Sequence, residues 1–85
     1  MPSFEIEHIL VLDAGVAVLA RQQDEGEFTV TSSSTLGGVP LREYLDIPRK
    51  LLPDGSPDLK FFAFQLANRE DASKLAVGQV AALAP

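Results

Sequence analysis

The chain has 85 residues, and its seven Lys and Arg against twelve Asp and Glu give it a formal charge of −5. A chain of this length buries only about 60% of its unfolded surface, which leaves room for one domain over residues 1–85. The lack of cysteine excludes disulfides, thiolate metal sites and a cysteine nucleophile. No apolar stretch is long enough to span a membrane and no basic residue precedes one at the N-terminus, so we expect a cytoplasmic protein without membrane contact.

The first third of the chain predicts a three-stranded meander. Residues Phe4–Leu12 alternate between apolar and polar and then become apolar on both faces, which indicates a strand buried in its second half. A turn at 13–15 precedes a β-branched run over Val16–Arg21, which predicts a hairpin. A second turn at 24–26 leads into Glu27–Thr31, which we expect to be the third strand.

The pattern weakens in the middle of the chain. Residues Ser32–Gly38 offer little apolar surface and much backbone freedom, so we expect a loop there, and the most mobile segment of the chain. Residues Val39–Leu52 are interrupted by Pro40 and Pro48 and predict one or two short, irregular strands. A helical turn over residues 41–45 is the alternative.

The most apolar strand follows the clearest turn. Residues Pro53–Asp58 combine prolines with a glycine and predict a chain reversal. Residues Leu59–Ala67 then predict a central strand with Phe62, Phe64 and Leu66 on its core face. We expect truncation of either phenylalanine to Ala to cost several kcal/mol.

The C-terminal segment predicts a short helical turn and a closing strand. Asn68 can cap the turn through its side-chain carbonyl, and two acidic residues follow at the positive end of the helix. Val77–Leu83 predicts a strand because Gly78 interrupts any helix, although the alanine-rich stretch 72–83 leaves a helix as the alternative. Many short β segments between Gly and Pro turns predict an all-β fold, a small closed or nearly closed antiparallel β-barrel of about six strands.

Most of the chain resembles domain 2 of elongation factor Tu and its relatives among the translational GTPases. The stretches that carry the resemblance are Arg49–Gly55, Leu59–Leu66, Arg69–Asp71 and Gly78–Ala81, with Phe4–Ile9, Gly15–Val18 and Gly26–Phe28 in the N-terminal half. The chain departs from the family where Ala20 or Arg21 replaces a Gly, and where Ser32–Ser34 replaces a Gly-Asp pair. The resemblance implies a translation-factor-like barrel that acts as a stand-alone domain. No phosphate-binding loop motif occurs, so nucleotide hydrolysis is excluded.

No catalytic or metal-binding constellation emerges from the sequence. Alternation places His8 on the same strand face as Ile6, which favours a partly buried structural histidine. Glu5 and Glu7 face the other side, so a metal site is not expected. The serines and threonine of 32–35 have no neighbouring base that would make one of them a nucleophile. We therefore predict no catalytic residue, no metal and no cofactor.

The candidate partner-binding residues are Ser33, Ser34, Arg49, Lys50 and Arg69. The two serines lie in the predicted loop, where binding residues are common. The three cations form a basic patch if closure of the barrel brings them together. Phe61 would then be either a stacking surface for a base beside them or, as we favour, a core residue.

These observations predict a non-enzymatic β-barrel module that binds a macromolecular partner, which we expect to be a protein. A second copy of the chain is a further candidate partner. The alternative is an RNA- or ribosome-contacting accessory of translation, which the resemblance suggests and the acidic net charge disfavours. A third hypothesis, a small hydrolase or isomerase, requires a carboxyl group of perturbed pKa near His8.

Overall fold

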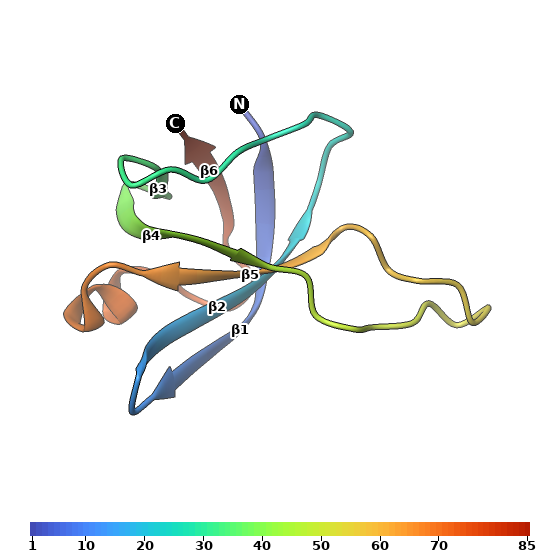
Figure 1. Cartoon of the computed structure of the whole chain (residues 1–85), viewed down its shortest axis with the longest axis horizontal. Helices are drawn as coiled ribbons and strands as arrows, with labels where there is room; N and C mark the ends of the chain where they lie inside the picture. Colours follow the sequence, from blue (N-terminus) through green and yellow to red (C-terminus); the bar gives the residue numbers. More distant parts are fainter.

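The computed structural model describes the whole chain, residues 1–85, as a closed antiparallel barrel of six strands (Figure 1). The elements in chain order are β1 (Ser3–Leu12), β2 (Gly15–Gln22), β3 (Thr35–Leu36), β4 (Val39–Asp46), β5 (Phe61–Leu66), the 3₁₀ helix η1 (Arg69–Lys74) and β6 (Val80–Ala84). The strand order around the barrel is β1-β2-β5-β4-β3-β6. The all-β class, the barrel and the short helical turn before the last strand are confirmed. The only helix has six residues, so none could cross a membrane.

A cluster of phenylalanines fills the barrel. Phe4 and Phe64 meet edge to face with ring centroids 5.0 Å apart, and Phe28 meets Phe62 in the same way at 4.9 Å. This geometry is favourable for aromatic pairs beyond the area that they bury. The predicted core face of β5 is confirmed, because Phe62, Phe64 and Leu66 are all buried within the same cluster.

The predicted third strand of the meander is wrong. Residues 27–31 form no strand, and β2 pairs with β5 instead, from Ala17↔Gln65 to Arg21↔Phe61. Both edges of β2 are occupied, by β1 and by β5, so the segment has no free edge of β2 to join, while Phe28 and Val30 still pack against the core. Hydrophobic burial thus holds the segment against the barrel in place of a hydrogen-bonded ladder.

The segment 32–38 contains structure where we expected a mobile loop. β3 lies within it, and Leu36 is buried in the core. A two-residue turn, Gly37-Gly38, joins β3 to β4 with φ values of 60° and 82°. Positive φ at both central residues is the requirement of a type I′ hairpin turn, and glycine meets it without strain.

A β-bulge reverses the inward and outward faces of β1. Ile6 pairs with Ala20 but His8 pairs with Leu19, so Glu7 is an extra residue in the ladder. His8 is therefore exposed instead of sharing the buried face of Ile6, which corrects the prediction. Ile9 is the residue that returns to the core.

The second half of β1 is exposed, contrary to the prediction. Leu10, Val11 and Leu12 all present large apolar surfaces to solvent. β2 pairs with β5 only from Ala17 onward, so the end of the β1–β2 hairpin extends past the neighbouring strands (Figure 1).

The remaining elements settle two alternatives. Residues 41–45 belong to β4 and are not helical, and residues 80–84 form β6 and are not helical either. Gly78 has a φ of 90° just before β6, which ends any helix there.

Asn68 occupies the N-cap position of η1, but its side-chain carbonyl accepts no hydrogen bond from the helix, contrary to the prediction. Its backbone oxygen instead accepts a hydrogen bond from Asp71 N at 3.2 Å.

Candidate functional site

The most prominent surface feature is an arm, residues 47–60, that projects from the barrel between β4 and β5 (Figure 1, right). Asp58 N donates to Lys50 O at 2.8 Å, and Leu52 N donates to Ser56 O at 2.8 Å. The predicted reversal over residues 53–58 is confirmed, with Gly55 at a φ of 88°. The two limbs of the arm therefore hold each other in register.

The arm exposes apolar side chains around a hollow. Leu51 and Leu59 are 67% and 73% exposed, and Ile47 is also largely exposed. The hollow, which we call the arm groove, has a volume of about 520 Å³. It is lined by Ile47, Pro48, Arg49, Lys50, Leu51, Pro57, Asp58 and Leu59. Adjoining exposed apolar groups of this kind are typical of binding surfaces.

Four charged residues, which we call the base network, fasten the arm to the barrel. Arg21 Nε on β2 donates to Glu7 Oε2 on β1 at 2.8 Å, and Arg21 Nη1 lies 2.7 Å from Asp58 Oδ2 at the arm base. The second contact is an ion pair whose N–H is not aimed at the oxygen. Lys50 Nζ completes the set at 3.5 Å from Glu7 Oε1. The network thus links both limbs of the arm to two strands.

The base network also covers an aromatic ring. Lys50 Nζ lies 4.2 Å from the centroid of the Phe61 ring, and Arg21 Cζ lies 5.5 Å from it. Both cations are within the range of a cation–π interaction. Phe61 is only 4% exposed, so its ring offers no open face on which a nucleic-acid base could stack. Phe61 is a buried core residue, as we expected, although it lies outside the cluster of side chains that fills the barrel.

The charges of the network are mutually stabilised. Burial alone would raise the pKa of Glu7, but the hydrogen bond from Arg21 and the charges of Arg21 and Lys50 outweigh it and lower that pKa. Burial likewise opposes ionisation of Asp58, and Arg21 together with the backbone N–H of Lys60 lowers its pKa below the usual value. Both carboxylates are therefore ionised at neutral pH.

The five predicted partner-binding residues do not form one surface. Arg49 and Lys50 both line the arm groove. Arg69 lies on η1, at the opposite end of β5 from the arm (Figure 1). There its Nη1 donates to Leu12 O at 2.6 Å, at the end of the β1–β2 hairpin.

The two serines have different environments. Ser34 is 1% exposed, and its Oγ accepts a hydrogen bond from Thr31 N at 2.8 Å. Ser34 therefore holds the turn before β3 and lies away from the surface that a partner can reach. Ser33 is exposed, with its Oγ 3.0 Å from Thr31 Oγ1.

The acidic side chains and the single histidine form no metal-binding cluster. No three His, Asp or Glu side chains come together at one point. Near the exposed His8, Glu7 is already engaged by Arg21 and Lys50. The buried Asp71 pairs with Lys74 at 2.9 Å within η1.

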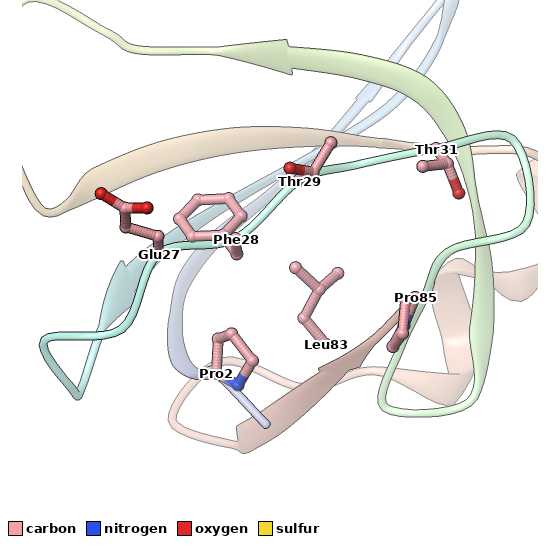
Figure 2. Close-up of a pocket in the computed structure, with 7 residues that line it drawn as sticks. All are labelled: Pro2, Glu27, Phe28, Thr29, Thr31, Leu83 and Pro85. Atoms are coloured by element: carbon pink, nitrogen blue, oxygen red, sulfur yellow. The ribbon is translucent and has the colours of Figure 1, made fainter.

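A second hollow lies at the end of the barrel where the chain termini meet. Figure 2 shows Pro2, Phe28, Leu83 and Pro85 around it, and its volume is about 370 Å³. Glu27, Thr29 and Thr31 supply its polar groups. Sequence reasoning missed this hollow, because it depends on the unpaired segment 27–31 crossing beside the end of β6.

Comparison with known proteins finds no matching family model, no matching curated protein and no matching solved structure.

Proposed function

We propose that this protein is a non-enzymatic module that binds a protein partner through the arm groove. The observation that carries the proposal is the exposure of Leu51 and Leu59 on an arm that is hydrogen-bonded internally and tied to the barrel. Burying such side chains against a partner gains the hydrophobic free energy that folding has left unused.

The fixed geometry of the arm supports the same conclusion. The base network and the hydrogen bond from Asp58 N to Lys50 O limit how far the arm can move before a partner arrives. Preorganised surfaces lose less conformational entropy on binding. Apolar anchors surrounded by charged and polar groups are also the usual anatomy of protein interfaces.

Photo-crosslinking in the native host tests this proposal. Leu59 is replaced by the photoreactive p-benzoylphenylalanine, and Leu12, another exposed leucine at the far hairpin end, is replaced in a control. We expect a discrete, nuclease-resistant protein adduct from position 59 and none from position 12. Adding Leu51→Asn should reduce the adduct about fivefold or more, whereas Leu12→Asn should leave it unchanged. The lack of a protein adduct, or equal labelling from both positions, would overturn the proposal.

An RNA- or ribosome-contacting role, as in translation factors, is the second candidate. It is favoured by the adjacent Arg49 and Lys50 in the groove, since paired cations can contact phosphates. Such binding would weaken steeply with added salt, because each phosphate contact releases counterions. A nuclease-sensitive adduct at position 59, together with salt-dependent binding of tRNA, would support this role over a protein partner.

A further inference from the structure

We infer that the arm groove recognises a peptide segment that presents a carboxylate beside a large apolar side chain. This inference rests on the proposed protein-binding function and specifies the chemistry of the partner. The charges of the groove and the position of its apolar side chains carry the argument.

The first observation is that the unmatched charge in the groove is positive, although the whole chain carries −5. Of the charged residues that line it, Asp58 is paired with Arg21, and Lys50 is paired with Glu7. Arg49 is exposed and takes part in no ion pair or hydrogen bond. A partner that covers Arg49 must pair its guanidinium, because an unpaired charge in an interface is costly. A carboxylate is the group in proteins that does so, with two parallel N–H donors available to it.

The second observation is the apolar surroundings of that cation. Ile47 and Leu51 lie two positions away from Arg49 along the chain on either side, and Leu59 lines the same hollow from the other limb. A ligand that supplied only negative charge would leave these three side chains in water. A segment with an apolar side chain next to the carboxylate satisfies both requirements at once.

The same surroundings argue against phosphate as the intended anion. The ring of Phe61 is covered by Lys50 and offers no stacking platform. The exposed Asp54 at the turn of the arm would repel a nucleic-acid backbone that followed the arm. A single carboxylate bound at Arg49 needs no stacking surface and does not extend along the arm to Asp54.

Selection from a random peptide library displayed on phage tests the inference. The immobilised full-length protein is the bait, and the Arg49→Glu variant is the bait in a parallel selection. Arg42→Glu is the matched control, because Arg42 is likewise exposed, lies outside the groove, forms no ion pair and changes the net charge equally. We expect the selected peptides to be enriched in Asp or Glu next to Leu, Ile, Phe or Met.

Binding of a synthetic peptide from the selection is then measured by fluorescence anisotropy. Arg49→Glu should weaken it by at least about tenfold, Arg49→Lys by less, and Arg42→Glu should leave it within about twofold. Leu51→Asn should also weaken it. Circular dichroism of each variant confirms that the barrel is intact.

The outcomes separate the two proposals. Selected peptides that depend on Leu51 but are neutral or basic, or that bind the Arg49→Glu variant equally well, would overturn this inference and leave protein binding at the arm in place. Tighter binding of a single-stranded oligonucleotide than of any selected peptide, lost in the Arg49→Glu variant, would overturn it in favour of phosphate. The lack of both selected peptides and a crosslink at position 59 would overturn the proposed function itself.

Discussion

Two of the three phenylalanines of β5 show how one strand serves two purposes. Phe64 is fully buried among the other rings, whereas Phe61 lies beneath the cations of the base network. Removing Phe64 leaves a cavity in a closed barrel, while removing Phe61 takes away a partner of Lys50 and Arg21 at the arm base.

We therefore expect Phe64→Ala to lower the free energy of unfolding by about 3–5 kcal/mol and Phe61→Ala, which lies outside the main cluster, by about 2–3 kcal/mol. Urea denaturation followed by circular dichroism measures both values. If Phe64→Ala does not fold, Phe64→Leu provides the comparison with Phe61→Leu. Equal losses of unfolding free energy at positions 61 and 64 would contradict the view that Phe64 supports the main core whereas Phe61 supports the base of the arm.

The Gly37-Gly38 turn allows a sharper comparison. A Cβ at Gly37, with φ at 60°, would lie 3.2 Å from the Cβ of Ala81 on β6, whereas a Cβ at Gly38 would meet nothing within 4 Å. Both alanine variants force a left-handed backbone, which costs roughly 1–2 kcal/mol. Gly37→Ala should therefore destabilise the barrel more than Gly38→Ala in thermal unfolding. Gly26→Ala, where φ is not positive, is the control and should have little effect.

At this scale the sequence predicted which side chains of β5 form the core but not the faces of β1. The alternation of apolar and polar residues predicts the buried face of a strand as long as the hydrogen-bond ladder is regular. In β5 it correctly identified Phe62 and Phe64 as core residues. The bulge at Glu7 breaks that rule, because the extra residue turns His8 outward. A bulge is set by the pairing with β2, so nothing in the pattern of β1 alone reveals it.

At the level of elements, the arm depends on ion pairs, and its stability should depend on pH. The pKa values of Glu7 and Asp58 lie below their ordinary values of 4.5 and 3.8. A carboxyl whose pKa is lowered by folding stabilises the folded state above its ordinary pKa, and this contribution is lost as the pH falls through the folded-state value. The contribution is thus complete at neutral pH, begins to decline as the pH falls towards the ordinary values of 4.5 and 3.8, and is lost only as the pH falls through the lowered folded-state values.

We expect the amide hydrogens of Leu52 and Asp58, which are hydrogen-bonded within the arm, to exchange faster as the pH falls through the lowered pKa values, after correction for intrinsic rates, while those of β5 remain protected. Glu7→Gln should remove part of the difference, because it already lacks the carboxylate at neutral pH. Hydrogen exchange measured by NMR between pH 3 and pH 6 checks this. Protection of the arm that stays constant over the whole range would show that the base network does not hold it.

The elements that sequence reasoning assigned correctly are those with strong local chemistry, such as the β1–β2 hairpin and the reversal at 53–58. The segment 27–31 has the same apolar alternation as a strand, and nothing in its local sequence reveals that β5 occupies the edge of β2 that the segment was expected to join. The Gly37-Gly38 hairpin could have been predicted, since two glycines between short β-prone runs are a known turn signal. The arm groove could not, because its two walls come from the separate limbs of the arm.

Across the whole molecule, closure of the barrel depends on β6, which pairs with β1 on one side and β3 on the other. Deleting residues 80–85 should expose both edges and the core side chains between them, so we expect loss of cooperative unfolding and collapse of amide dispersion in the NMR spectrum. Deleting Pro85 alone, which is exposed and outside β6, should leave both unchanged. A cooperative transition in the longer deletion would mean that five strands suffice.

The pairing that closes the barrel also brings its two ends together. Leu83 N donates a hydrogen bond to Pro2 O at 2.8 Å, and both ends lie on one side of the molecule, away from the arm (Figure 1). A short linker could therefore join residue 85 to residue 1, and a new opening at the exposed Asp13-Ala14 turn would give a circular permutant with all six strands in place. Because its two ends are adjacent, the domain could also be inserted into a loop of a host protein. Its arm would then point away from the site of insertion.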